Sequence, residues 1–240
     1  MHELRRLLPT SEGFHSALPL GLAALDGSLP DGGLACGALH EVVPESEAAL
    51  PAAFGFIVAI LARLSGAFPL IFVLPAYGRR QHGRLCGHGL NSLGFDPARL
   101  ILVETMHRKE TLWALAEALR SAAPQAVVGM VDKLDLKTSQ KLQLAASDAG
   151  LPLLLLRPAQ TLEASAATTR WRVGTAEAAR DRFGMHARPR WRLQLERARN
   201  GRPGEWVVEY DHVAHRFGLA AALADPAFSR GASDRTQAAI

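Results

Sequence analysis

The most informative chemistry in this sequence follows its first apolar strand, Leu39–Val43, because α/β folds usually place a ligand after such a strand. A loop that binds a nucleotide triphosphate reads G-x-x-x-x-G-K-[ST]. Its glycines let backbone N–H groups wrap the phosphates, its lysine neutralises them and its hydroxyl holds magnesium. Here the eight positions are Val43, Pro44, Glu45, Ser46, Glu47, Ala48, Ala49 and Leu50, without glycine, lysine or threonine. Two carboxylates stand where phosphate charge would arrive, so we predict no cofactor at this loop.

Arginines gather towards the end of the chain, with tryptophans among them. The arginines are Arg170, Arg172, Arg188, Arg190, Arg192, Arg197, Arg199 and Arg202. Arginine binds phosphate and tryptophan stacks on bases, so a DNA-binding surface is one interpretation. An acidic protein partner is a second. A third is an antiparallel sheet that packs Trp171 and Trp191 inward and turns its arginines to water, and the alternation along the strands favours this for the tryptophans.

The remaining reactive residues do not form a recognised site. His82, Cys86 and His88 are close in sequence, but their spacing matches no standard zinc site, so we predict no metal. No Ser-His-Asp set or working carboxylate pair is evident, and we predict no catalytic residues. The arginines of the segment 78–84 form either a basic patch beside the ligand edge of the sheet or a solvated helix start.

The composition is that of a folded protein in a reducing compartment. Hydrophobic residues make up 48% of the 240 positions and charged residues 21%, which favours a sizeable core over disorder. The net charge of +4 is compatible with nucleic acid but does not require it. The two cysteines do not make a secreted disulfide framework, and the longest apolar stretch, Leu50–Leu64, is too short to span a membrane. We therefore expect a cytoplasmic protein without a membrane partner.

The apolar pattern predicts an α/β fold. Short apolar runs alternate with helices, which indicates a parallel sheet buried on both faces: strands at 38–43, 70–74, 100–103, 126–131 and 153–156, and helices at 51–64, 109–122 and 138–149. After residue 164 apolar and polar residues alternate, as in half-exposed antiparallel strands, at 169–173, 190–196 and 206–210. Asn200-Gly201 predicts a hairpin between the last two strands. The sheet therefore begins parallel and ends antiparallel.

This succession resembles the core of RecA. In RecA an S-L-G-L-D segment leads through G-G-L-P-x-G and an I-V-E-I strand to G-P-E-S-S-G-K-T. This chain has L-G-L at 20–22, G-G-L at 32–34, H-E-V at 40–42 and P-E-S at 44–46. By this resemblance Ala49 and Leu50 stand at the lysine and the threonine. RecA's mobile DNA-binding loop follows the strand that corresponds to 153–156; here the link 158–167 is short and carries no cation, which argues against DNA binding.

The ImuA proteins of bacterial inducible-mutagenesis cassettes resemble the chain more narrowly. Their motifs are L-P-L-G-L-x-A-L-D, G-x-L-H-E-V, L-Q-L-A-A, T-R-W-R-V and a hairpin R-P-R-W-R-L-x-L-x-R-x-R-x-G-R-P-G. The chain carries these motifs in the same order at 18–26, 37–42, 142–146, 169–173 and 188–204. Five motifs in order are far more specific than any one of them.

The resemblance implies a RecA-like core of the P-loop NTPase type, with a degenerate phosphate loop and no ATPase activity. It implies an adaptor in SOS-induced, error-prone translesion DNA synthesis that associates with the nucleoid when DNA is damaged. The implied partners are an ImuB-like Y-family polymerase relative and an error-prone C-family DNA polymerase, with RecA and weak DNA binding as further contacts. A divergent DNA-dependent ATPase or recombinase and a SulA-like inhibitor of cell division are the alternatives. We expect an N-terminal segment over 1–16, a core domain over 17–219 and a flexible tail over 220–240.

Overall fold

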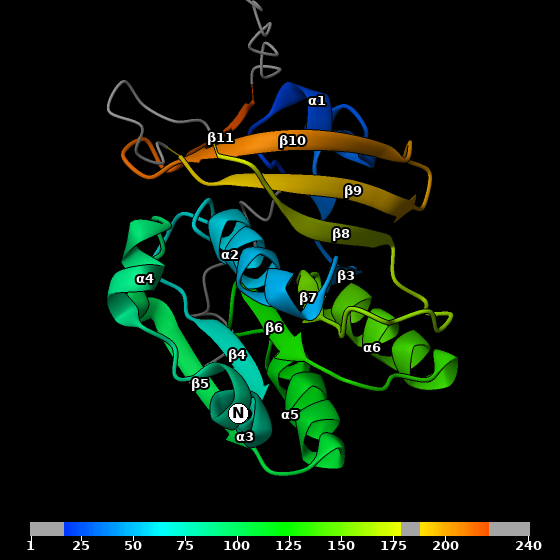
Figure 1. Ribbon diagram of the computed structural model, residues 1–240. Helices are drawn as coiled ribbons and strands as arrows, with labels where there is room; N and C mark the ends of the chain where they lie inside the picture. The colour runs from blue at the N-terminus through cyan, green and yellow to red at the C-terminus, as the bar shows by residue number, and fades with distance from the viewer. Residues whose placement is uncertain (1–16, 179–187, 221–240) are drawn as a thin grey trace, which may run out of the picture.

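A nine-stranded sheet runs through the computed structural model, which describes residues 17–178 and 188–220 (Figure 1). The predicted segment 1–16 and residues 221–240 of the predicted tail lie outside the described residues. The strand order is β11-β10-β9-β8-β3-β7-β6-β4-β5. The strands are β3 (Leu39–Pro44), β4 (Leu70–Pro75), β5 (Leu100–Thr105), β6 (Ala126–Met130), β7 (Leu153–Leu156), β8 (Thr169–Ala176), β9 (Arg190–Ala198), β10 (Gly204–Asp211) and β11 (Arg216–Leu219).

The six strands from β8 to β5 are parallel, as the continuous apolar runs predict. Helices cover both of their faces: α2 (Leu50–Leu61) packs on one side, and α5 (Arg108–Ser121) and α6 (Leu136–Ala149) on the other. Strand β7 shows why an all-leucine strand suits this position. Leu154 and Leu156 join the core around α2, while Leu153 and Leu155 join the core under α5 and α6.

The sheet continues past β8 as an antiparallel extension, which confirms the predicted change of pattern. Trp171 and Trp191 are buried in the core beside α2, as their alternation with arginines predicts. Asn200 has a left-handed φ of 59° in the turn between β9 and β10, the conformation that favours Asn-Gly in hairpins. The sequence pattern did not predict β11, which pairs with β10 and adds Phe217 to the same core.

Local capping sets the ends of the long helices. Helix α6 begins at Leu136, two residues before the predicted start, because the Asp135 carboxylate accepts hydrogen bonds from the backbone N–H and the hydroxyl of Thr138 at 2.9 and 2.7 Å. Gly150 ends it with a φ of 67°. Short elements complete the described fold: β1 (Ala17–Leu18), α1 (Ala23–Asp26), β2 (Leu34–Ala35), α3 (Ala76–His82), α4 (Gly87–Ser92) and the 3₁₀ turns Pro30–Gly32, Glu47–Ala49 and Pro97–Arg99.

Candidate functional site

The loop between β3 and α2 directs its first acidic side chain towards the antiparallel extension. The backbone N–H of Glu45 donates to the carbonyl oxygen of Val173 at 2.7 Å, which prolongs the pairing of β3 with β8. The Glu45 carboxylate then forms an ion pair with Arg192 of β9 at 2.9 Å. It lies over Gly174 of β8, where any Cβ would collide with it. The Glu45 carboxylate is thus neutralised by Arg192 of the same chain.

The rest of this loop is short and its end belongs to the core. Ser46, Glu47 and Ala48 are exposed, whereas Ala49 and Leu50 are buried. Pro51 occupies the first turn of α2 and has no N–H to offer a ligand. The positions that the RecA resemblance equates with a lysine and a threonine therefore hold buried apolar side chains.

A cavity of about 490 Å³ lies beside the start of α2, at the carboxyl edge of the parallel strands. Its apolar lining includes Phe54, Met130 and Leu156. Its polar lining includes His82, Arg84 and Arg79, of which Arg79 forms an ion pair with Glu104 at 3.2 Å. This edge is where open α/β sheets bind ligands, but a mainly apolar lining suits an apolar group better than a triphosphate.

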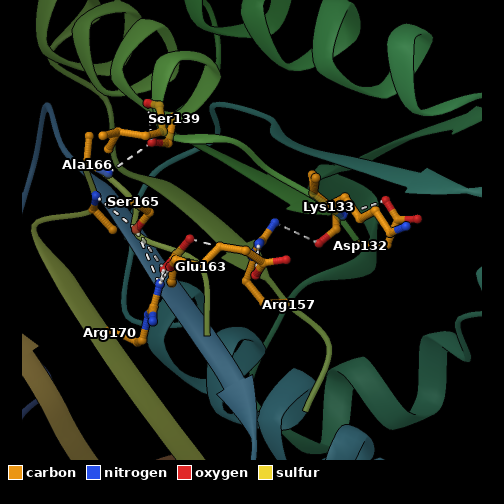
Figure 2. Close-up of polar contacts among 12 residues, drawn as sticks. Asp132, Lys133, Ser139, Arg157, Glu163, Ser165, Ala166 and Arg170 are labelled. Carbon is orange, nitrogen blue, oxygen red and sulfur yellow. Dashed lines mark hydrogen bonds and ion pairs between the residues drawn. The ribbon is translucent and has the colours of Figure 1, made fainter. Parts of the chain in front are cut away.

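A cluster of charged side chains lies against β3, and Figure 2 labels Arg157, Glu163 and Arg170 among its members. Glu41, in the middle of this strand, is completely buried and pairs with Arg170 of β8 at 2.7 Å and with Arg157, directly after β7, at 3.5 Å. Arg157 also pairs with Glu163 at 3.3 Å and donates to the carbonyl oxygen of Val131 at 3.1 Å. Burial lowers the pKa of Arg157, and the charges of Glu41 and Glu163 oppose that shift. Two carboxylates and two guanidinium groups balance one another here.

The cluster and its neighbours fix the link 158–167 that joins β7 to β8. Figure 2 shows Arg170, Ser165 and Glu163 together: the Arg170 guanidinium donates to the carbonyl oxygen of Glu163 at 2.8 Å. The Ser165 hydroxyl donates to the Glu41 carboxylate at 3.0 Å, and the backbone N–H of Ala166 donates to the Ser139 hydroxyl of α6 at 2.9 Å. The segment that the RecA resemblance equates with a mobile DNA-binding loop is thus bonded to three elements of the core.

Most of the predicted arginine surface is engaged within the chain. Five of its members form ion pairs: Arg170 with Glu41, Arg172 with Glu196, Arg188 with Asp211, Arg190 with Glu209, and Arg192 with Glu45 and Glu205. Arg190 is itself buried. Arg197 and Arg199 instead donate to the carbonyl oxygens of Ser165 and Ala166, and Arg202 is exposed. Among these eight arginines, the three without a carboxylate partner in the described residues therefore lie at the end of β9 and in the turn after it.

His40 is a second polar side chain inside β3. Its Nδ1 lies 2.8 Å from the Thr169 hydroxyl and its Nε2 lies 2.9 Å from the carbonyl oxygen of Ala35. Nε2–H must donate to the carbonyl, and in the neutral ring Nδ1 accepts from the Thr169 hydroxyl. Burial lowers the pKa of His40 to about 4. This histidine ties β2 and β8 to the central strand.

The charge cluster around Glu41 was not among the sites predicted from the sequence. Two features of the sequence indicate it: Glu41 lies in the middle of an apolar strand, and Arg157 directly follows four leucines. A charged side chain at such a position is rarely buried without a partner of opposite charge, so the two residues could have been expected to pair. Across residues 17–178 and 188–220 no group of three His, Cys, Asp or Glu side chains could hold a metal ion, so His82, Cys86 and His88 do not meet as ligands. Within the same ranges, none of the helices has the length and apolar character needed to cross a membrane.

Comparison with known proteins places these features in a family. No family model matches the chain. Two curated relatives are named Protein ImuA, one from Caulobacter vibrioides strain NA1000 / CB15N and one from strain ATCC 19089 / CIP 103742 / CB 15. Each is 35% identical over 229 residues, which cover 87% of this chain and 90% of the relative. The relationship extends over nearly the whole length of both proteins, and the chain belongs to the ImuA family.

Proposed function

We propose that this protein is a non-catalytic, RecA-like adaptor in SOS-induced, error-prone translesion DNA synthesis. Membership of the ImuA family supports a role in the inducible-mutagenesis response. The adaptor would bind an ImuB-like Y-family polymerase relative and act with an error-prone C-family DNA polymerase, with RecA and DNA as secondary contacts. It would work in the cytoplasm and join the nucleoid when DNA is damaged.

The observation that carries the non-catalytic part is the state of the loop after β3. Glu45 is paired with Arg192, and the two following core positions, Ala49 and Leu50, are buried and apolar. A triphosphate at this loop would meet no lysine and would disrupt an ion pair.

Titration calorimetry with ATP and magnesium tests this part directly. We expect no saturable heat at millimolar nucleotide, with RecA in the same buffer as the positive control. Micromolar, magnesium-dependent binding would favour the divergent ATPase instead. In that case Glu45→Ala and Leu50→Thr should alter the affinity, whereas Val213→Ala, in an exposed turn far along the sequence, should not.

The adaptor part is tested by co-purification with an ImuB-like Y-family polymerase relative from the same organism. We expect a complex that survives size-exclusion chromatography in the presence of nuclease, because the proposed contact is between proteins. Absence of a complex under these conditions, together with inhibition of FtsZ polymerisation by the purified chain, would replace the proposal with the SulA-like alternative.

Direct DNA binding is proposed only as a weak contact. The link 158–167 is bonded to the core, and most arginines of the extension have carboxylate partners. Fluorescence anisotropy with a single-stranded oligonucleotide should therefore show binding that is lost on raising salt from 50 to about 200 mM. Tight binding that persists at the higher salt would contradict this part of the proposal.

A further inference from the structure

Two hollows flank the outer side of α6. One, of about 690 Å³, lies between α5 and α6. The other, of about 520 Å³, lies between α6, the link 158–167 and β9. Leu144 lines both, so it forms a ridge between them. The two hollows thus make one continuous surface, which we call the α6 surface.

Large apolar side chains are exposed at the centre of the α6 surface. Trp113 of α5 is 65% exposed and Leu144 is 62% exposed, and Leu136 at the start of α6 is 46% exposed. Trp171 and Trp191 of the same chain are buried in the core. Between the two helices the lining includes the small side chains Ala116 and Ala145, which leave room for a neighbour. Exposed tryptophan and leucine around such a hollow are typical of a protein interface.

The charges that border this surface are mainly positive. Lys141 lines the hollow between the helices, as does Arg120, whose charge is compensated by an ion pair with Glu117, and Arg197 and Arg199 line the hollow beside β9. Arg197 and Arg199 donate to carbonyl oxygens, which do not cancel their charge. One carboxylate, that of Asp148, is in the lining of the first hollow. An apolar centre with a cationic border is complementary to an acidic amphipathic segment.

We propose that the α6 surface binds an amphipathic, acidic α-helix of a protein partner. A third helix would lie in the hollow between α5 and α6 and place its leucines against Trp113 and Leu144, while its acidic residues would meet Lys141, Arg197 and Arg199. Nucleic acid fits less well, because exposed Trp113 and Leu144 make much of the surface apolar and the Asp148 carboxylate lines one of its hollows. This inference deepens the proposed adaptor function, on which the identity of the partner rests.

The experiment uses the full chain and two probes. The first is a fluorescein-labelled model helix of about 14 residues, similar in length to α5 and α6, with leucine at the i, i+3, i+4 and i+7 positions and glutamate elsewhere. A peptide with lysine in place of glutamate is its charge control. The second probe is the ImuB-like protein. The variants are Leu144→Asp and Trp113→Ala, and the matched control is Val213→Asp, since Val213 is 92% exposed in a turn away from this surface.

We expect saturable anisotropy with the acidic helix and none with the lysine peptide. Leu144→Asp and Trp113→Ala should weaken binding of either probe by about tenfold or more, and Val213→Asp by less than about twofold. Thermal unfolding of each variant checks that the fold is kept. Because both altered side chains are mainly exposed, their midpoints should stay close to that of the unaltered protein.

The outcomes separate the surface from the proposed function. If the ImuB-like protein does not bind while the acidic helix still binds through Leu144, the proposed partner is refuted but the helix-binding role of the α6 surface is supported. Binding of both probes that ignores Leu144→Asp would overturn the surface and leave the adaptor function standing. Loss of oligonucleotide binding alone in this variant, or dissociation of a dimer by it in sedimentation, would also overturn the inference in favour of DNA or a second copy.

Discussion

Replacing Glu41 by glutamine should destabilise the fold more than the same replacement of Glu163, the other carboxylate of the buried cluster. The cluster balances Glu41 and Glu163 against Arg157 and Arg170. Glu41→Gln keeps the shape of the side chain but leaves one net positive charge, with Arg157 only 1% exposed. Removing one partner from a buried pair costs about 3–5 kcal/mol. We expect about 3 kcal/mol, the lower end, because Glu163 remains beside Arg157.

Glu163→Gln is the matched control, because it removes the same charge from the same cluster. The Glu163 side chain is 49% exposed, so solvent screens its pair with Arg157 and the cost should stay below about 1 kcal/mol. In thermal unfolding followed by circular dichroism, the midpoint of Glu41→Gln should fall by roughly 6–12 °C. Equal midpoints for the two variants, or a change of less than about 2 °C for Glu41→Gln, would refute the view that burial makes this pair strong.

Three further predictions concern single buried sites. Because burial lowers the pKa of His40 to about 4, the unfolded chain takes up a proton below pH 6.5 that the folded chain does not. The contribution of His40 to the free energy of unfolding should therefore be complete above pH 6.5 and should decrease by about 1.4 kcal/mol per pH unit as the pH falls towards 4. In urea titrations at pH 6.5 and pH 5, His40→Gln should reduce this dependence on pH. A Cβ at Gly129 would lie 2.8 Å from Leu115 of α5, so Gly129→Ala should cost about 1–3 kcal/mol, and an unchanged melting midpoint would show that α5 moves freely. The buried indole N–H of Trp171 has no partner among the described residues, so Trp171→Phe should cost less than about 1.5 kcal/mol and Trp171→Ala roughly 3–5 in denaturant unfolding.

The sheet could be predicted because the apolar pattern of each strand indicates which of its two faces is buried. Strand β7 is four consecutive leucines with both faces buried, and its bounds agree with the prediction. The alternation at 169–173 likewise shows that Trp171 faces the core. Strand β11 was missed because it follows a turn and is half polar, so its pairing with β10 decides its structure more than its own pattern does.

The site was less predictable, because its contacts join residues that are distant in sequence. Glu41 meets Arg157 and Arg170 only because β3 lies between β7 and β8, and no local pattern states that order. For the same reason the arginines of the extension looked like an open basic surface, although Glu196 and Glu209 were visible nearby in the sequence. Local pattern predicts which face a side chain takes, but only the strand order predicts its partner.

The central place of β3 has a consequence for how the chain is made. Both of its neighbours, β7 and β8, are synthesised more than a hundred residues after it. Until residue 156 has left the ribosome neither edge of β3 has its partner, and until residue 176 has left it the edge that pairs with β8 stays open and Glu41 lacks Arg170. Strand pairings between segments so far apart in sequence form slowly, and the unpaired strand edges are prone to aggregation until they form. Newborn chains should therefore depend on chaperones until β8 arrives, and fragments that stop before it should aggregate.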